Sequence, residues 1–91
     1  MAVTVRIPTT MRPLTGGDKQ VSVDSGTLSD IVAELEGAHP GMGERLVDDD
    51  GALRKFVNVF VDDDDVRYLD GLDTKVDDGI TVSIIPAVAG G

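Results

Sequence analysis

The sequence contains no cysteine and no tryptophan, and its aromatic residues are two phenylalanines and one tyrosine. Without cysteine, disulfide frameworks, thiolate metal sites and cysteine nucleophiles are excluded, so any sulfur chemistry must use another atom of the protein. Because aromatic side chains are scarce, valine, isoleucine and leucine must form most of a core. A chain of 91 residues suffices for one modest core, which predicts a single small domain.

Basic residues are also scarce, because eight lysines and arginines stand against 17 aspartates and glutamates, a formal net charge of −9. This charge repels nucleic acid and anionic membranes, and we expect neither as a partner. No apolar run approaches the length of a membrane span, and the first residues lack the pattern of a secretion signal. We therefore expect a cytoplasmic protein whose partners are proteins with basic docking surfaces.

The first half of the chain predicts a β-hairpin followed by a helix. Residues 3–7 and 20–23 alternate apolar and polar side chains, with a loop expected at 9–15. Thr27, followed three residues later by Asp30, resembles a capping box that opens a helix. The apolar residues expected on its buried face are Leu28, Ile31, Val32, Leu35 and Ala38.

A Pro-Gly pair at 40–41 ends this helix, and residues 42–47 predict a further helical turn. Glu36 is expected to face solvent.

The second half of the chain predicts three more strands. Residues 56–61 and 80–85 alternate two faces, 66–68 predict a short strand, and 69–76 predict a loop with a single turn near Leu72. This order indicates an α+β fold in which one main helix covers one face of a mixed sheet. We expect the first strand, at 3–7, to pair in parallel with the last at the sheet centre, which fits a β-grasp fold.

Two aspartate runs, at 48–50 and 62–65, suggest calcium loops as an alternative to solvated turns. The position that requires glycine in such a loop is Leu53 for the first run and Arg67 for the second, which favours turns. The single histidine, His39, is most simply a helix C-terminal group, because no second histidine or cysteine exists to complete a metal site.

The chain ends in a stretch without charged or bulky polar side chains, Pro86-Ala87-Val88-Ala89-Gly90-Gly91. Pro86 has no N–H, so we expect a domain at 1–86 and a flexible tail at 87–91, which could extend roughly 17 Å. Gly90 and Gly91 have no Cβ and can enter a channel that rejects larger residues. The alternatives are a tail shaped for another protein's active site and a frayed terminus without a role.

Phe60 and Ile85 are predicted on the sheet face opposite the helix. Exposed apolar area is common on small sheets. Its position beside the tail nevertheless favours a docking patch for a partner protein, with Phe56 and Arg6 or Arg67 at its edge.

These features together resemble the ubiquitin-like sulfur carriers of the ThiS/MoaD family. The resemblance rests on the order of elements, on residues 78–82 (DGITV) and on the closing residues 84–91. Within the family, residues 54–61 (RKFVNVFV), residues 64–67 (DDVR) and the Pro-Ala-Val-Ala-Gly-Gly end are most similar to the carrier of the cysteine pathway.

The resemblance implies that the function lies at Gly91. A ubiquitin-activating-type adenylyltransferase/sulfurtransferase would use ATP and Mg²⁺ to adenylate the Gly91 carboxylate, and a sulfur source would displace AMP to form a thiocarboxylate. In the cysteine branch, a PLP-dependent synthase that uses O-phosphoserine would receive the sulfur, and a zinc metalloprotease would release cysteine. No cofactor is then expected on this chain, which would be a protein co-substrate and not an enzyme. The residues expected inside the partner's channel are Ala87, Val88, Ala89 and Gly90.

Three functions remain open from the sequence. The first is a sulfur carrier, for cysteine or alternatively as the molybdopterin synthase small subunit or the thiamine-pathway carrier. The second is a ubiquitin-like modifier joined through Gly91 to lysines. The third is an interaction domain with an inert tail. Carrier and modifier share the activation step and differ only in the acceptor.

Overall fold

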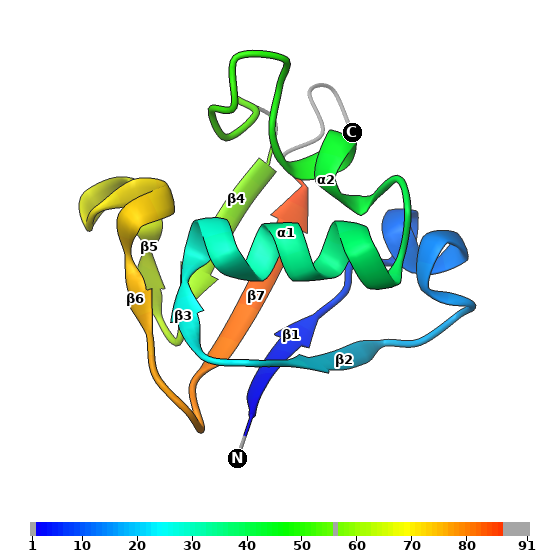
Figure 1. The fold of residues 1–91 in the computed structure, drawn as a ribbon, viewed down its shortest axis with the longest axis horizontal. Coiled ribbons are helices and arrows are strands. Elements are labelled where there is room, and N and C mark those ends of the chain that lie inside the picture. The colour runs from blue at the N-terminus through cyan, green and yellow to red at the C-terminus, as the bar shows by residue number, and fades with distance from the viewer. Residues whose placement is uncertain (1, 56, 87–91) are drawn as a thin grey trace.

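The structure is a computed structural model that describes residues 2–55 and 57–86 (Figure 1). In chain order, its elements are β1 (Val3–Arg6), η1 (Thr9–Thr15), β2 (Gln20–Val23), β3 (Gly26–Thr27), α1 (Leu28–Ala38), α2 (Met42–Leu46), β4 (Val57–Val61), β5 (Asp64–Asp65), η2 (Val66–Tyr68), η3 (Gly71–Asp73), β6 (Lys75–Val76) and β7 (Thr81–Pro86), where η marks a 3₁₀ helix. No helix within the described ranges is long and apolar enough to cross a membrane.

The main sheet has five strands in the order β2-β1-β7-β4-β5. Strand β1 pairs antiparallel with β2 and parallel with β7, and β7 pairs antiparallel with β4. The predicted hairpin, the mixed sheet and the parallel pair of first and last strands at its centre are therefore confirmed. With α1 lying across one face, this is the predicted α+β, β-grasp architecture (Figure 1).

Helix α1 begins at the predicted capping box. The Asp30 N–H donates to Thr27 Oγ1 at 3.2 Å, and the Thr27 N–H donates to Asp30 Oδ2 at 3.1 Å. Each bond satisfies a backbone donor that the first turn of a helix otherwise leaves unpaired. Ala38 was expected in the core and is exposed, because it is the last residue of α1. The buried residues of the helix are Leu28, Ile31, Val32 and Leu35.

Glu36 does not face solvent as expected. Its Oε1 accepts hydrogen bonds from the backbone N–H groups of Gly41 at 3.1 Å and Gly43 at 2.9 Å. These donors lie at the N-terminus of α2, where a carboxylate is favourable. Met42 and Leu46 of α2 are buried, as the predicted helical turn requires.

Short elements account for the errors in the predicted secondary structure. Residues 66–68 form the 3₁₀ helix η2 and not a strand, because the Asp65 side chain accepts the Arg67 N–H at 2.9 Å and caps it. The short strand in this region is β5, which immediately precedes η2 in the sequence and pairs with β4. The loops expected at 9–15 and 69–76 contain η1 and β6, and β6 pairs with β3 in a second, two-stranded sheet. The single turn expected near Leu72 is confirmed as η3.

The first aspartate run forms a turn. Asp48 Oδ1 accepts the N–H groups of Asp50 and Ala52, and Gly51 has a positive φ of 81°. Within residues 2–55 and 57–86, no group of three or more histidine, cysteine, aspartate or glutamate side chains could hold a metal ion.

The capping box predicts the effect of one substitution on stability. Thr27→Ala removes the acceptor of the Asp30 N–H and should lower the free energy of unfolding by about 1 kcal/mol. Ser29→Ala, on the exposed side of the same helix, should change it by less than about 0.5 kcal/mol. Urea denaturation followed by circular dichroism measures both. Equal destabilisation by the two variants would contradict a specific role for the cap.

Candidate functional site at the end of strand β7

Strand β7 ends immediately before residues 87–91, the predicted tail. Residues 84–86 pair with 57–59 of β4, whereas the partners from β1 end at Ser83. Pro86 is the last residue of the strand and pairs with Val57, and the boundary between domain and tail at this residue stays a prediction. Strand β4 therefore pairs with the last residues of β7, up to Pro86, on one side only.

The structure places Phe60 and Ile85 on the sheet face opposite α1. Phe60 lies opposite Ser83 and Ile85 lies opposite Asn58, so the two apolar residues are diagonal neighbours, typically about 7–8 Å apart between Cα atoms. Ile85 is 48% exposed and Phe60 is half-buried. Their neighbours along the strands, Val59 and Ile84, are buried on the core side. An apolar patch on this face is thus present, and its role in docking stays a prediction.

Arg67 forms hydrogen bonds both beside this patch and at the start of β4. Its Nη1 donates to Asn58 Oδ1 at 2.6 Å, and its Nη2 donates to the carbonyl oxygens of Arg54 at 2.8 Å and Val57 at 2.7 Å. One planar guanidinium therefore connects η2 to the start of β4, whose first residue pairs with Pro86. Arg67 was expected at the edge of the patch, and its hydrogen bond to Asn58, the residue paired with Ile85, places it beside the patch with its guanidinium bound to the protein.

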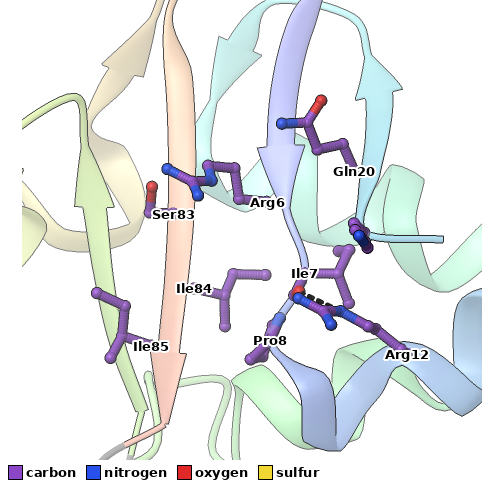
Figure 2. Close-up of a pocket in the computed structure, with 9 residues that line it drawn as sticks. Arg6, Ile7, Pro8, Arg12, Gln20, Ser83, Ile84 and Ile85 are labelled. Carbon is purple, nitrogen blue, oxygen red and sulfur yellow. Dashed lines mark hydrogen bonds between the residues drawn. The ribbon is translucent and has the colours of Figure 1, made fainter. Parts of the chain in front are cut away.

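A pocket of about 350 Å³ lies beside the ends of β1 and β7, and we call it the basic pocket (Figure 2). Residues that contribute to its lining include Arg6, Arg12, Lys19, Ser83, Ile84 and Ile85.

Arg12 extends back from η1 and donates its Nε hydrogen to the Ile7 carbonyl at 3.2 Å, the contact dashed in Figure 2. Of the two predicted edge residues that the structure describes, Arg6 contributes to the lining of this pocket and Arg67 does not.

Arg12 was missed because its position depends on a 3₁₀ helix that the sequence did not predict, and Lys19 was missed because it lies one residue before the predicted strand at 20–23. The 3₁₀ helix η1 occupies the expected loop and returns Arg12 to the end of β1. Lys19 immediately precedes β2, and its carbonyl accepts the Ile7 N–H at 2.8 Å. Extending the alternation at 20–23 by one residue would place Lys19 on the same face as Val21 and Val23, which pack against the core, so the sequence pattern gives no signal for Lys19 in this pocket.

The remaining predicted site residues lie outside the described residues. They are Phe56 at the patch edge and Ala87, Val88, Ala89, Gly90 and Gly91 of the tail. Their roles stay predictions.

Comparisons with known proteins agree with this architecture. The chain matches the model of the ThiS family over residues 5–91. It is 50% identical over 93 residues to the sulfur carrier protein CysO of Mycobacterium tuberculosis, covering 100% of both chains. It is 48% identical to a chain in the crystal structure of the Amycolatopsis orientalis BexX/CysO complex, with a TM-score of 0.93 and coverage of 99% of this chain and 100% of that one. It is also 41% identical over 68 residues to small archaeal modifier protein 3 of Haloferax volcanii, covering 75% of this chain and 73% of that protein.

The strand alternation predicts opposite outcomes for two adjacent isoleucines. Ile85→Asp places a charge on an exposed face and should change the free energy of unfolding by about 0.5 kcal/mol or less. Ile84→Asp buries an unpaired carboxylate and should cost about 4 kcal/mol or more. Thermal melting compares the two. An unfolded Ile85→Asp variant would show that this side chain belongs to the core.

Proposed function

Because the chain belongs to the ThiS family of sulfur carrier proteins, we propose that Gly91 is its reactive residue. The Gly91 carboxylate is converted to a thiocarboxylate and then gives up that sulfur for biosynthesis. The observation that supports this most is the position of β7. This strand runs through the centre of the sheet and ends at Pro86. Because its last residues pair with β4, residues 87–91 follow directly from a fixed part of the sheet.

The chemistry requires activation, because a carboxylate is a poor electrophile. A Gly91 carboxylate oxygen attacks the α-phosphorus of ATP, pyrophosphate leaves, and an acyl-adenylate forms. A sulfur nucleophile then attacks the acyl carbon, and AMP leaves with the electron pair of the broken C–O bond. The partner enzyme supplies Mg²⁺ and the catalytic groups, while this chain supplies reach and a slim terminus. The chain is thus a co-substrate and binds no cofactor of its own.

The adenylating enzyme must contact the end of the sheet. Five extended residues span at most about 17 Å, so an active site that holds Gly91 lies within that distance of Pro86. The patch of Phe60 and Ile85 is on this part of the surface, and residues 87–90 would occupy the channel to the active site. The crystal structure of a BexX/CysO complex supports the binding of a partner protein by this family.

The proposed destination of the sulfur is cysteine. Identity of 50% to CysO along the whole chain favours this pathway over molybdopterin and thiamine. The acceptor is then an aminoacrylate that a cytoplasmic PLP-dependent synthase forms from O-phosphoserine, and a zinc metalloprotease frees the cysteine attached to Gly91. A role as a protein modifier is the second candidate, because the similarity to small archaeal modifier protein 3 includes three quarters of the chain.

Thiocarboxylate formation tests the proposal directly. The pure protein with ATP, Mg²⁺, its adenylating enzyme and sulfide should gain the mass of one sulfur in place of one oxygen. A variant without Gly91 should gain none, although its free energy of unfolding should change by no more than about 0.5 kcal/mol. Intact-mass spectrometry and thermal melting provide the two readouts. No mass change in the wild-type chain, with an enzyme active on another carrier, would refute the proposal.

The choice of pathway has its own test. The thiocarboxylated protein, incubated with O-phosphoserine and the PLP-dependent synthase, should yield the chain with cysteine attached through Gly91. Transfer of the sulfur to a molybdopterin precursor by a synthase large subunit would preserve the carrier function and reject the cysteine pathway. Recovery of Gly91 from cells mainly as an isopeptide on lysines would establish the modifier.

A further inference from the structure

The basic pocket is a local exception in an acidic protein. The whole chain has a formal net charge of −9, yet three of its eight basic residues, Arg6, Arg12 and Lys19, line this one pocket. Among the described residues that line it, none is aspartate or glutamate. Charges of one sign gathered in a concave surface attract ligands of the opposite sign. The net charge alone predicts a partner with a basic surface, whereas this pocket indicates a contact with an acidic part of a partner.

Two of these cations are available to a ligand. Among the described residues, no hydrogen bond involves the side chain of Arg6 or Lys19, and both residues are exposed. Arg12 uses its Nε hydrogen to bind the Ile7 carbonyl, which orients its guanidinium at the pocket wall (Figure 2). Arg67 differs, because its guanidinium donates to three acceptors of the protein.

The size and composition of the pocket indicate a peptide and not an inorganic anion. Its volume of about 350 Å³ lies within the range of organic ligand sites, which is about 300–1,000 Å³. Ile84 and Ile85 belong to its lining, and Ile85 is 48% exposed. Phosphate or sulfate would not cover this apolar part. A segment that combines carboxylates with an apolar side chain matches both parts.

The position of the pocket identifies which protein carries that segment. Ile85 is part of the lining and is one residue from Pro86, where the tail begins. An enzyme that holds Gly91 within about 17 Å of Pro86 must lie over this end of the sheet. The partner surface that meets the pocket is therefore close to the partner's adenylation site.

We propose that the basic pocket receives an acidic, partly apolar peptide segment of the enzyme that adenylates Gly91. The inference rests on the proposed function, because that function defines the partner. Carboxylates of the segment pair with Arg6, Arg12 and Lys19, and an apolar side chain packs on Ile85. Such pairs orient a complex and favour the correct partner more than they raise affinity.

Charge reversal at Lys19 tests the proposal, and Lys75 provides a matched control. Both are exposed lysines, Lys19 beside the pocket and Lys75 in β6 of the second sheet, so each change to glutamate alters the net charge equally. Lys19→Glu should raise the KM for the carrier in thiocarboxylation by about tenfold with kcat unchanged, and Lys75→Glu by less than about twofold. Arg6→Glu should behave as Lys19→Glu. Added salt should reduce the difference, because exposed charges are screened.

Calorimetric titration of the same variants with the adenylating enzyme, without ATP, measures docking independently of sulfur transfer. If wild-type chain binds but gains no sulfur, the proposed function fails, and the loss of affinity in Lys19→Glu alone still supports the pocket. Equal losses in Lys19→Glu and Lys75→Glu would overturn the inference, because net charge alone would explain them. Absence of binding by the wild-type chain would also overturn it.

The chain's own tail is the competing occupant. NMR spectra of the full chain and of a chain ending at Pro86 decide between the two. Unchanged Arg6 and Arg12 side-chain resonances are expected if the pocket is free for a partner. A shift of both on removal of residues 87–91 would show that the Gly91 carboxylate fills the pocket and would overturn the proposal.

Discussion

The pairing of β7 on both of its sides is the constraint on which the rest of the structure depends. Parallel pairing with β1 and antiparallel pairing with β4 place this last strand at the centre of the sheet. Helix α1 covers one face, and Val82 and Ile84 of β7 contribute to the core beneath it. The strand that precedes residues 87–91, where we propose that the reactive group lies, is thus held by pairing on both sides and by the core. A carrier needs this separation, because its terminus must enter a second protein while its domain stays folded.

The surface at the end of β7 divides into two parts with different chemistry. Phe60 and Ile85 form an apolar area against β4, and Arg6, Arg12 and Lys19 form the basic pocket beside the end of β1. Ile85 belongs to both parts. A partner that covers both would meet apolar contacts, which stabilise a complex, and charges, which set its orientation. The overall negative charge elsewhere on the chain disfavours other negatively charged surfaces, so the basic pocket also contributes to the selection of a partner.

Elements long enough to show a repeating apolar pattern were predictable, and most elements of two or three residues were not. The alternation at 57–61 and 81–85 determined the strand faces, and hence the exposure of Ile85, because a period of two places successive side chains on opposite faces. Strand β6 pairs with β3 over two residues, too few for a sequence pattern, and η2 depends on the Asp65 cap. Arg12 and Lys19 meet only through the tertiary path of η1 and the hairpin register, so sequence spacing could not bring them together.

The central claim is that the partner binds the end of the sheet at Pro86, five residues before Gly91. The five isoleucines of the chain are suitable methyl probes: Ile85 and Ile84 lie at this end, Ile7 borders the basic pocket, Ile31 is in α1, and Ile80 precedes β7 at its opposite end. Cross-saturation NMR of the methyl-labelled chain bound to its adenylating enzyme should attenuate the Ile85 signal most and leave Ile31 and Ile80 unaffected. Attenuation centred on Ile31 or Ile80, with Ile85 unchanged, would contradict the account.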